Sequence, residues 1–125
     1  MQCTMLKSKI HRATLTGVDP DYEGSITLDR ALLDRSGLLP GEQVHVLNMA
    51  NGERLITYAI PAPRGSGTVM LNGPAARKGL AGDKVVILAY AQMSARAARR
   101  HRPVVVLVDA RNRPCRKRSP RRVLG

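Results

Sequence analysis

Two Gly-Ser pairs offer the simplest chemistry in this chain, because in each a serine hydroxyl lies beside a peptide carbonyl. The pairs are Gly24-Ser25, in the stretch DYEGSIT, and Gly65-Ser66, in the stretch RGSGT. A serine hydroxyl is a weak nucleophile unless its target carbonyl is distorted and donors meet the developing oxyanion. Glycine permits the backbone torsions that could store such distortion. Each pair is therefore either a site of self-cleavage or an ordinary turn.

Other polar side chains occur where a small β protein has little structural need for them. Lys9 and His11 would share one face of a strand, because residues i and i+2 of a strand point the same way. Arg54 and Tyr58 would share a face in the same manner, with Thr57 opposite. Taken singly, each is more simply a solvated charge or a half-buried residue of a sheet. Only their combination suggests a site.

The common enzyme signatures are absent from the sequence. It contains no G-x-x-x-x-G-K, no G-x-G-x-x-G and no G-x-S-x-G, and nothing in it points to a Ser-His-Asp triad. The three histidines lack the spacing of metal ligands, and Cys3 and Cys115 belong to no C-x-x-C pair. We therefore expect no metal and two free thiols.

The sequence predicts that these residues are positioned by short strands separated by turns. Helical turns are predicted for DRALLDRSG, with Asp29 as N-cap and Gly37 as C-cap, and for PAARKGL and SARAARRHR. Asn51-Gly52 predicts a hairpin turn in which both residues have positive φ. We predict a mainly β barrel of about six to eight short strands with short helices. The strand candidates are KIHRATLTGV, GSITL, EQVHVLN, ERLITYAI, TVMLNG, KVVILAYAQM and PVVVLVD.

The net charge of +12 is concentrated near the C-terminus. Residues 1–90 hold ten Lys and Arg against eight Asp and Glu, whereas residues 91–125 hold eleven Lys and Arg against Asp109 alone. We expect a folded domain over residues 1–110 and a basic, mobile tail over residues 111–125. Such a tail could bind nucleic acid non-specifically. It has no aromatic residue to stack on bases, which argues against specific nucleic-acid recognition.

Length and hydropathy indicate one compact domain. The chain has 125 residues, of which 43% are hydrophobic, and this is too small a core for two domains. No apolar run approaches the roughly 20 residues of a membrane-spanning helix. No apolar stretch follows the basic start, so we expect no signal peptide and a cytoplasmic location.

An ordered set of motifs resembles the aspartate 1-decarboxylase family, whose members are small pyruvoyl-dependent enzymes that make β-alanine for pantothenate and coenzyme A biosynthesis. The resemblance runs from about residue 1 to residue 108. It implies a double-ψ β-barrel, which agrees with the strand-rich pattern, and a homotetramer with active sites between subunits. The motifs are TMLKSKIHRATLT, YEGSITLD, NGERLITYAI, RGS, LNGPAA and GDKVVILAY.

This resemblance implies that Gly24-Ser25 is the pair that reacts. In the family, the serine hydroxyl attacks the glycine carbonyl, the amide becomes an ester, and β-elimination breaks the chain. The remaining dehydroalanine hydrolyses to a pyruvoyl group and ammonia. Cleavage here would give a β-chain of residues 1–24 and an α-chain of residues 25–125. The resemblance assigns Thr57 and Asn72 to this processing site and leaves Gly65-Ser66 as a loop.

The same resemblance implies how L-aspartate would bind and react. The pyruvoyl group forms a Schiff base with the substrate and accepts the electrons freed by loss of CO₂, so neither pyridoxal phosphate nor a metal is expected. Arg54 and Lys9 are cations for the two carboxylates, in either arrangement. Tyr58 is the proton donor. Further pocket positions implied by the resemblance are His11, Tyr22, Thr57, Gly73, Ala75 and Ala76.

Two residues depart from the family pattern and bear on the shape of the pocket. Pro74 interrupts the usual N-G-A-A and has no N–H to donate. Leu47 stands where the family often has an aromatic residue. Two other interpretations remain open at this point: a small β-barrel that binds nucleic acid through its basic tail, and an uncleaved, inactive homologue with a structural role. Cleavage could be spontaneous or could need a maturation partner.

Overall fold

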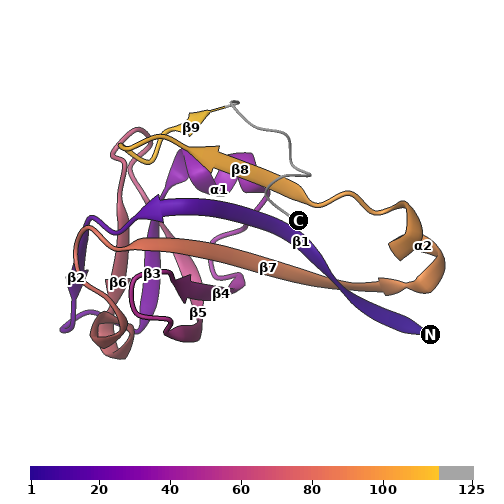
Figure 1. Cartoon of the computed structure of the whole chain (residues 1–125), viewed down its shortest axis with the longest axis horizontal. Helices are drawn as coiled ribbons and strands as arrows, with labels where there is room; N and C mark the ends of the chain where they lie inside the picture. Colours follow the sequence, from indigo (N-terminus) through magenta and orange to yellow (C-terminus); the bar gives the residue numbers. More distant parts are fainter. Residues whose placement is uncertain (116–125) are drawn as a thin grey trace.

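The computed structural model describes residues 1–115, and most of the expected basic tail, residues 116–125, lies outside the described residues. The described chain is mainly β with short helices, as predicted, but it has nine strands instead of about six to eight (Figure 1). The elements in chain order are β1 (Gln2–Thr14), β2 (Gly17–Asp19), β3 (Ser25–Asp29), α1 (Arg30–Ser36), β4 (Gln43–Asn48), β5 (Arg54–Ala62), β6 (Val69–Asn72), the 3₁₀ helix η1 (Gly73–Lys78), β7 (Lys84–Ser94), α2 (Ala95–Arg100), β8 (Val104–Val108) and β9 (Pro114–Cys115).

The strands follow one hydrogen-bonded order, β2-β6-β3-β5-β4-β7-β1-β8-β9. Three pairs are parallel, namely β1 with β8, β2 with β6, and β3 with β5, and the remaining pairs are antiparallel. Parallel neighbours need long connections, so strands distant in sequence become adjacent in space. This mixed sheet curls on itself without closing and fits the predicted double-ψ β-barrel.

The core lies inside the curled sheet and is built from alternate strand positions. In β4, Val44 and Val46 are fully buried, whereas His45 and Leu47 are half-buried on the opposite face. This is the period of two that places one face of a strand in the core. Each such buried aliphatic side chain contributes about 1.5–3 kcal/mol relative to exposure. No helix among residues 1–115 is long and apolar enough to cross a membrane.

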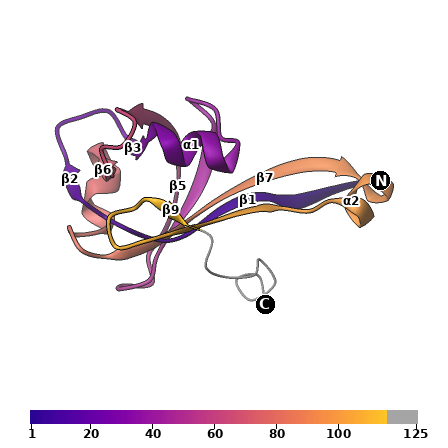
Figure 2. The same cartoon turned by 90° about the horizontal axis from the view of Figure 1, so that it is seen from above.

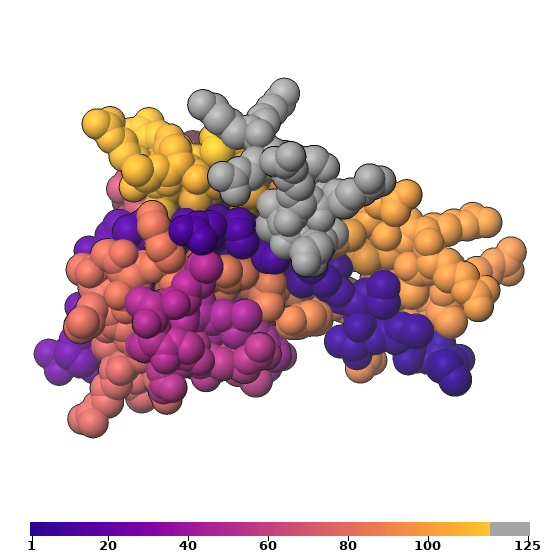
Figure 3. Space-filling view, in the orientation of Figure 1, coloured from indigo at the N-terminus to yellow at the C-terminus, as the bar shows by residue number. Residues whose placement is uncertain are grey.

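Strands β1 and β7 extend beyond the barrel as a long arm with α2 at its tip (Figures 1 and 2). Their register runs from Gln2 opposite Ser94 to Thr14 opposite Lys84. None of the residues of α2 is buried, and the arm projects from the rounded body in the space-filling view (Figure 3). In this ladder Lys9 pairs with Leu88 and precedes the buried Ile10, so its side chain points to the outer face of the sheet.

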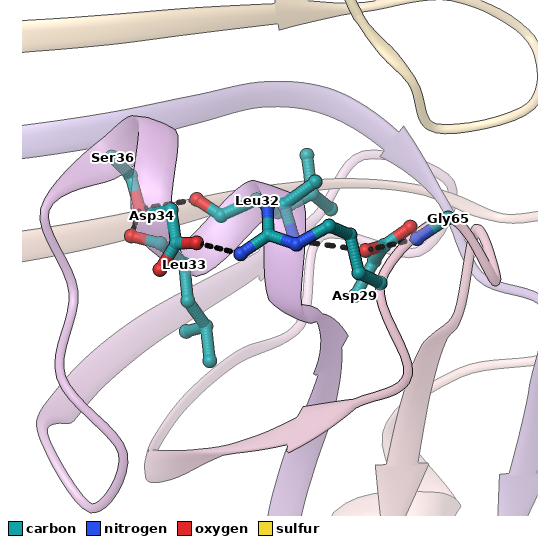
Figure 4. Close-up of polar contacts among 8 residues, drawn as sticks. Asp29, Leu32, Leu33, Asp34, Ser36 and Gly65 are labelled. Carbon is teal, nitrogen blue, oxygen red and sulfur yellow. Dashed lines mark hydrogen bonds and ion pairs between the residues drawn. The ribbon is translucent and has the colours of Figure 1, made fainter.

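The predicted helix after β3 is confirmed with both of its caps. The Oδ1 atom of Asp29 accepts a hydrogen bond from the backbone of Ala31 at 2.9 Å, and Gly37 ends α1 with a φ of 74°. Leu32 and Leu33 pack into the core, and the buried hydroxyl of Ser36 donates to the Leu32 carbonyl at 2.7 Å (Figure 4). The other two predicted helical stretches are confirmed as η1 and α2.

The hairpin between β4 and β5 is present, but the predicted turn is wrong. The connection runs over residues 49–53, and Gly52 has a φ of 75° while Asn51 does not have a positive φ. The backbone N–H of Asn48 donates to the Glu53 carbonyl at 2.8 Å, and that of Gly52 donates to the Asn48 carbonyl at 2.9 Å. The side chain of Asn48 also accepts from Ala50 at 2.8 Å, which stabilises this longer turn.

The folded chain continues past the expected end of the barrel at residue 110. Asn112 is 1% exposed, and its Oδ1 accepts from the Thr14 backbone at 2.7 Å. Its Nδ2 donates to the carbonyls of Thr14 at 2.8 Å and Gly67 at 2.9 Å. Cys115 in β9 then pairs with Leu107 in β8. These contacts place residues 111–115 within the folded domain.

Candidate active site

The hydroxyl of Ser25 is buried and held from two sides. Ser25 begins β3 and is 0% exposed. Its Oγ donates to the carbonyl of Glu23 at 2.9 Å and accepts from Nδ2 of Asn72 at 2.9 Å. Ser25 and Asn72 are also direct partners in the ladder between β3 and β6. The serine therefore sits in a fixed orientation, shielded from water, beside the peptide link to Gly24.

Asn72 is the residue that organises this end of the sheet. It is 1% exposed, and its Nδ2 also donates to Oγ1 of Thr27 at 2.7 Å, so the amide serves two hydroxyls. In addition it pairs with Asp19 of β2, on the other side of β6. A buried amide that lost these partners would cost about 1–3 kcal/mol. Thr27 was not predicted as part of the site, because nothing local marks a threonine inside an ordinary strand.

A cavity of about 400 Å³ opens beside Gly24. Most of its lining is apolar, with a hydroxyl from Thr57, a phenol from Tyr58 and an ammonium from Lys78, and this mixture is typical of small-molecule sites. In the parallel ladder of β3 and β5, Ile26 lies opposite Ala59, so Thr57 lies beside Gly24 two positions earlier. The lining residues are Gly24, Leu55, Ile56, Thr57, Tyr58, Pro74, Ala75 and Lys78.

Tyr58 keeps its proton in this environment. Its hydroxyl donates to Oε2 of Glu23 at 3.4 Å. Desolvation, followed by the negative charge and hydrogen bond of Glu23, raises the pKa of Tyr58 above its ordinary value. The phenol therefore carries a transferable proton at neutral pH. Glu23 was not predicted to act here. Its position beside the Gly24-Ser25 pair was the available signal, but its contact with a residue in β5 follows only from the fold.

Gly24 does not carry the torsion that the sequence suggested for it. It is not among the glycines with positive φ, so its φ alone does not require glycine. Gly73, in contrast, has a φ of 62° and lies against the backbone of Gly24 and Tyr22. Tyr22 itself is 53% exposed. The need for glycine at position 24 is therefore one of space, and the left-handed residue of this site is Gly73.

The start of η1 forms the wall beyond Gly73. Pro74 occupies the first turn of this helix, where a residue without an N–H is well accommodated, so the departure from the family pattern fits the backbone. Ala75 and Ala76 are both 8% exposed and pack against the barrel. Lys78 ends η1, lines the cavity and pairs with Glu53 at 2.6 Å. Lys78 is a third residue that sequence reasoning missed, since a lysine near a helix end is ordinarily solvated.

Within the described chain, neither Lys9 nor Arg54 lines the cavity beside Gly24. Across the sheet, Ile56 pairs with His45, His45 with Leu88, and Leu88 with Lys9. Three strand spacings put Lys9 about 14 Å along the sheet from Ile56 on the cavity wall. Burial lowers the pKa of Lys9 from its ordinary value.

Arg54 and His11 occupy different surroundings on the same outer face as Lys9. Arg54 is exposed at the start of β5, pairs with Leu47, and lies next to a residue of the cavity wall. His11 lines a separate cavity of about 450 Å³ together with Arg12 and Lys84. The structure thus brings together the predicted processing residues and Tyr58, but not the two predicted cations.

The cysteines and acidic residues of the described chain form no metal centre. No group of three or more His, Cys, Asp or Glu among residues 1–115 could hold a metal ion. Cys3 and Cys115 are both free thiols, as expected from their spacing.

Known proteins resemble this chain over nearly its whole length. The family model for aspartate decarboxylase matches residues 1–115. A protein of Trichormus variabilis named aspartate 1-decarboxylase is 55% identical over 114 residues, which cover 91% of this chain and 90% of the relative. Relatives of the same name from Maricaulis maris and Caulobacter vibrioides are 56% and 57% identical, cover 90% of this chain in each case, and are themselves covered to 93% and 95%.

Proposed function

The chain belongs to the aspartate decarboxylase family, and from that premise we propose that it is a self-processing, pyruvoyl-dependent aspartate 1-decarboxylase. Its substrate is L-aspartate, and its products are CO₂ and β-alanine, a precursor for pantothenate and coenzyme A. The observation that carries this proposal is the buried hydroxyl of Ser25, fixed by Asn72 beside a cavity that Gly24 lines.

Self-cleavage begins with the Ser25 hydroxyl. Its oxygen adds to the carbonyl carbon of Gly24, the C–N bond breaks, and the nitrogen takes up a proton, so that the amide becomes an ester. Loss of the Cα proton of residue 25 then breaks the Cβ–O bond and releases a carboxylate on Gly24. Water converts the remaining dehydroalanine to a ketone and ammonia. Asn72 holds the attacking oxygen, and Thr57 lies beside the carbonyl side of the link.

The residues of this chain fit the pyruvoyl group because its precursor is the buried Ser25 itself. Once formed, that group supplies a ketone that takes up the substrate amine and accepts the electron pair left by CO₂. Tyr58 holds a proton at the cavity wall and returns it to the carbon that has lost CO₂. Most of the cavity lining around Tyr58 is apolar and includes Leu55, Ile56 and Ala75.

We propose that substrate binding uses a second copy of the chain. Lys9 lies about 14 Å along the sheet from the cavity wall, which is farther than aspartate can bridge. The face between them carries apolar side chains such as Ile56, which is 57% exposed. We therefore propose a homotetramer in which Lys9, Arg54 and His11 of one subunit complete the cavity beside Gly24 of another. Both carboxylates of aspartate would then meet a cation.

Intact-mass spectrometry of the purified protein tests the proposed function. We expect two fragments, split after Gly24, with the larger one lighter than the unmodified fragment by the mass of ammonia. Ser25→Ala should remain full length and produce no β-alanine, whereas Ser66→Ala should be cleaved as the wild type is. Incubation with and without a cell extract separates spontaneous cleavage from assisted cleavage.

The opposite outcome is equally clear. An unbroken wild-type chain that still releases β-alanine would exclude the pyruvoyl mechanism. An unbroken chain that releases none, and that binds RNA tightly in a salt-sensitive manner, would favour the nucleic-acid-binding alternative.

A further inference from the structure

Gly73 lies against the backbone of Gly24, the residue whose carbonyl the proposed function cleaves from Ser25. A Cβ atom built on Gly73 would lie 2.7 Å from the nitrogen of Gly24, 2.7 Å from the carbonyl oxygen of Tyr22 and 2.8 Å from Cα of Gly24. Real Cβ atoms essentially never come within 3.0 Å of such neighbours. Only glycine at position 73 therefore leaves the backbone of residue 24 where it is.

The two neighbours of Gly73 lie against Ser25 and Gly24 from other directions. Asn72 donates to the Ser25 hydroxyl at 2.9 Å. The Cδ atom of Pro74 lies 3.3 Å from the place that a Cβ on Gly24 would occupy. Residues 72–74, which we call the β6–η1 corner, thus lie against the hydroxyl of Ser25 and the nitrogen and Cα of Gly24.

The pairing of β6 with β2 and β3 explains why the β6–η1 corner lies against Gly24 and Ser25. Asp19 at the end of β2 and Ser25 at the start of β3 both pair with Asn72, on opposite sides of β6. The loop of residues 20–24 therefore leaves and returns at the same residue of β6, and it must pass over the β6–η1 corner. The φ of Gly24 is not in the left-handed region, so its own torsion does not fix its place in this loop. We attribute its position to packing against the β6–η1 corner.

We propose that Gly73 is a positioning residue for self-cleavage, and that the β6–η1 corner sets the approach of the Ser25 hydroxyl to the Gly24 carbonyl. The inference rests on the proposed function, because it concerns the bond which that function breaks. It adds a role that precedes substrate binding, since the corner acts on the uncleaved chain. Displacing a reacting group by about 1 Å can slow a reaction about 100-fold.

The test is the rate of cleavage of Gly73→Ala, followed by intact mass after synthesis at low temperature. We expect cleavage at least about tenfold slower than in the wild type, because the new Cβ displaces Gly24. Gly52→Ala is the control for torsion, since Gly52 has a φ of 75° and nothing within 4 Å of its Cβ position. Gly67→Ala is the control for torsion and clash together, with a φ of 69° and a Cβ position 2.8 Å from the Arg111 carbonyl.

Both controls should cleave at the wild-type rate, although Gly67→Ala should unfold at a lower temperature. β-Alanine production is divided by the amount of cleaved chain, so that loss of processing is separated from loss of turnover. A Gly73→Ala protein that cleaves at the wild-type rate but turns over poorly would leave Gly73 as a pocket residue only and overturn the inference. A wild-type chain that never cleaves would instead overturn the proposed function.

A second pair of variants decides the matter if Gly73→Ala fails to fold. Gly24→Ala should cleave slowly, because its Cβ would meet Cδ of Pro74 at 3.3 Å. Replacing Pro74 by Ala in the same chain removes that contact, so the double variant should recover at least about threefold in cleavage rate relative to Gly24→Ala. Additive effects of the two substitutions would show that the corner does not position Gly24.

Discussion

Gly24-Ser25 and Gly65-Ser66 are the same dipeptide in two different surroundings. Ser25 is fully buried, and its hydroxyl both donates and accepts a hydrogen bond. Ser66 is exposed, and its hydroxyl accepts one bond, from the backbone of Thr68 at 3.3 Å. The glycines differ in the same sense. Gly65 has a φ of 84° with open space around its Cβ position, whereas Gly24 is packed against Gly73.

The loop around Gly65 is stabilised by a carboxylate that serves the backbone. Asp29 accepts from the N–H of Gly65 at 3.0 Å and from that of Gly67 at 2.8 Å, in addition to capping α1 (Figure 4). Burial alone would raise the pKa of Asp29, but the backbone N–H groups outweigh it and hold that pKa below its ordinary value. This arrangement fixes a turn and leaves the neighbouring hydroxyl without an activating partner. Surroundings, and not the dipeptide, decide which pair can react.

The largest difference between the two Gly-Ser pairs should come from replacing the buried asparagine beside each one. Asn72→Ala should abolish cleavage or slow it more than about 100-fold, because the Ser25 hydroxyl loses the donor that orients it. Intact mass over time measures this effect. Asn112→Ala is the matched control, since Asn112 is equally buried and holds Gly67 on the other loop.

Both variants should lose about 1–3 kcal/mol of stability, but only the first should lose cleavage. Equal loss of cleavage in the two variants would mean that general stability, and not the local donor, controls processing.

Tyr58→Phe should separate cleavage from turnover. The phenol lines the cavity and its hydroxyl bonds to Glu23 and not to Ser25, so cleavage should proceed at the wild-type rate. Decarboxylation should fall by about 100-fold or more, because the substituted ring has no proton to give. β-Alanine release per cleaved chain is the measurement, and Tyr90→Phe, on β7, is the control. Near-normal turnover in Tyr58→Phe would remove this residue from its role.

The sequence was sufficient to predict the elements of this site but not their assembly in one place. Most of the strands, the caps of α1 and the pair Ser25 and Asn72 were predicted, because strand alternation and capping are local patterns and the ordered motifs resemble a known family. Strand β9 was not predicted, since it lies in the segment expected to be a tail. The contact of Glu23 with Tyr58 was not predicted, since it joins the loop before β3 to β5, and these segments meet only through the parallel pairing of β3 with β5.

Turn geometry and backbone contact were the other failures, and both have a physical origin. Asn51-Gly52 is a signal for a two-residue turn, but the side chain of Asn48 stabilises a longer one by accepting from Ala50. The sequence also gave no means to assign the left-handed torsion to Gly73 instead of Gly24, because a close approach between two backbones depends on the register of three strands.

The two carboxylates beside the Gly-Ser pairs should respond differently to pH. The lowered pKa of Asp29 means that its contribution to stability is complete above the ordinary carboxyl pKa and is lost as pH falls through the folded-state value. Asp29→Asn should therefore cost about 1 kcal/mol near neutral pH and less in acid. Thermal unfolding from neutral to acidic pH measures the difference, and cleavage at Gly24 should be unaffected. A constant difference across that range would contradict the assignment.

The smallest expected effect comes from replacing Glu23. Its carboxylate accepts a hydrogen bond from the Tyr58 side chain, whereas that of Asp29 accepts from backbone N–H groups. Its charge and hydrogen bond raise the pKa of Tyr58, so Glu23→Gln should lower that pKa. A proton donor must be protonated to act, so the alkaline limb of the rate against pH should move to lower pH while the rate near neutrality changes little. The profile of β-alanine release per cleaved chain measures this shift, with Glu53→Gln as the control, because that carboxylate pairs with Lys78 and not with Tyr58. An unchanged alkaline limb would mean that the contact of Glu23 with Tyr58 belongs only to the uncleaved chain, and that cleavage after Gly24 ends it.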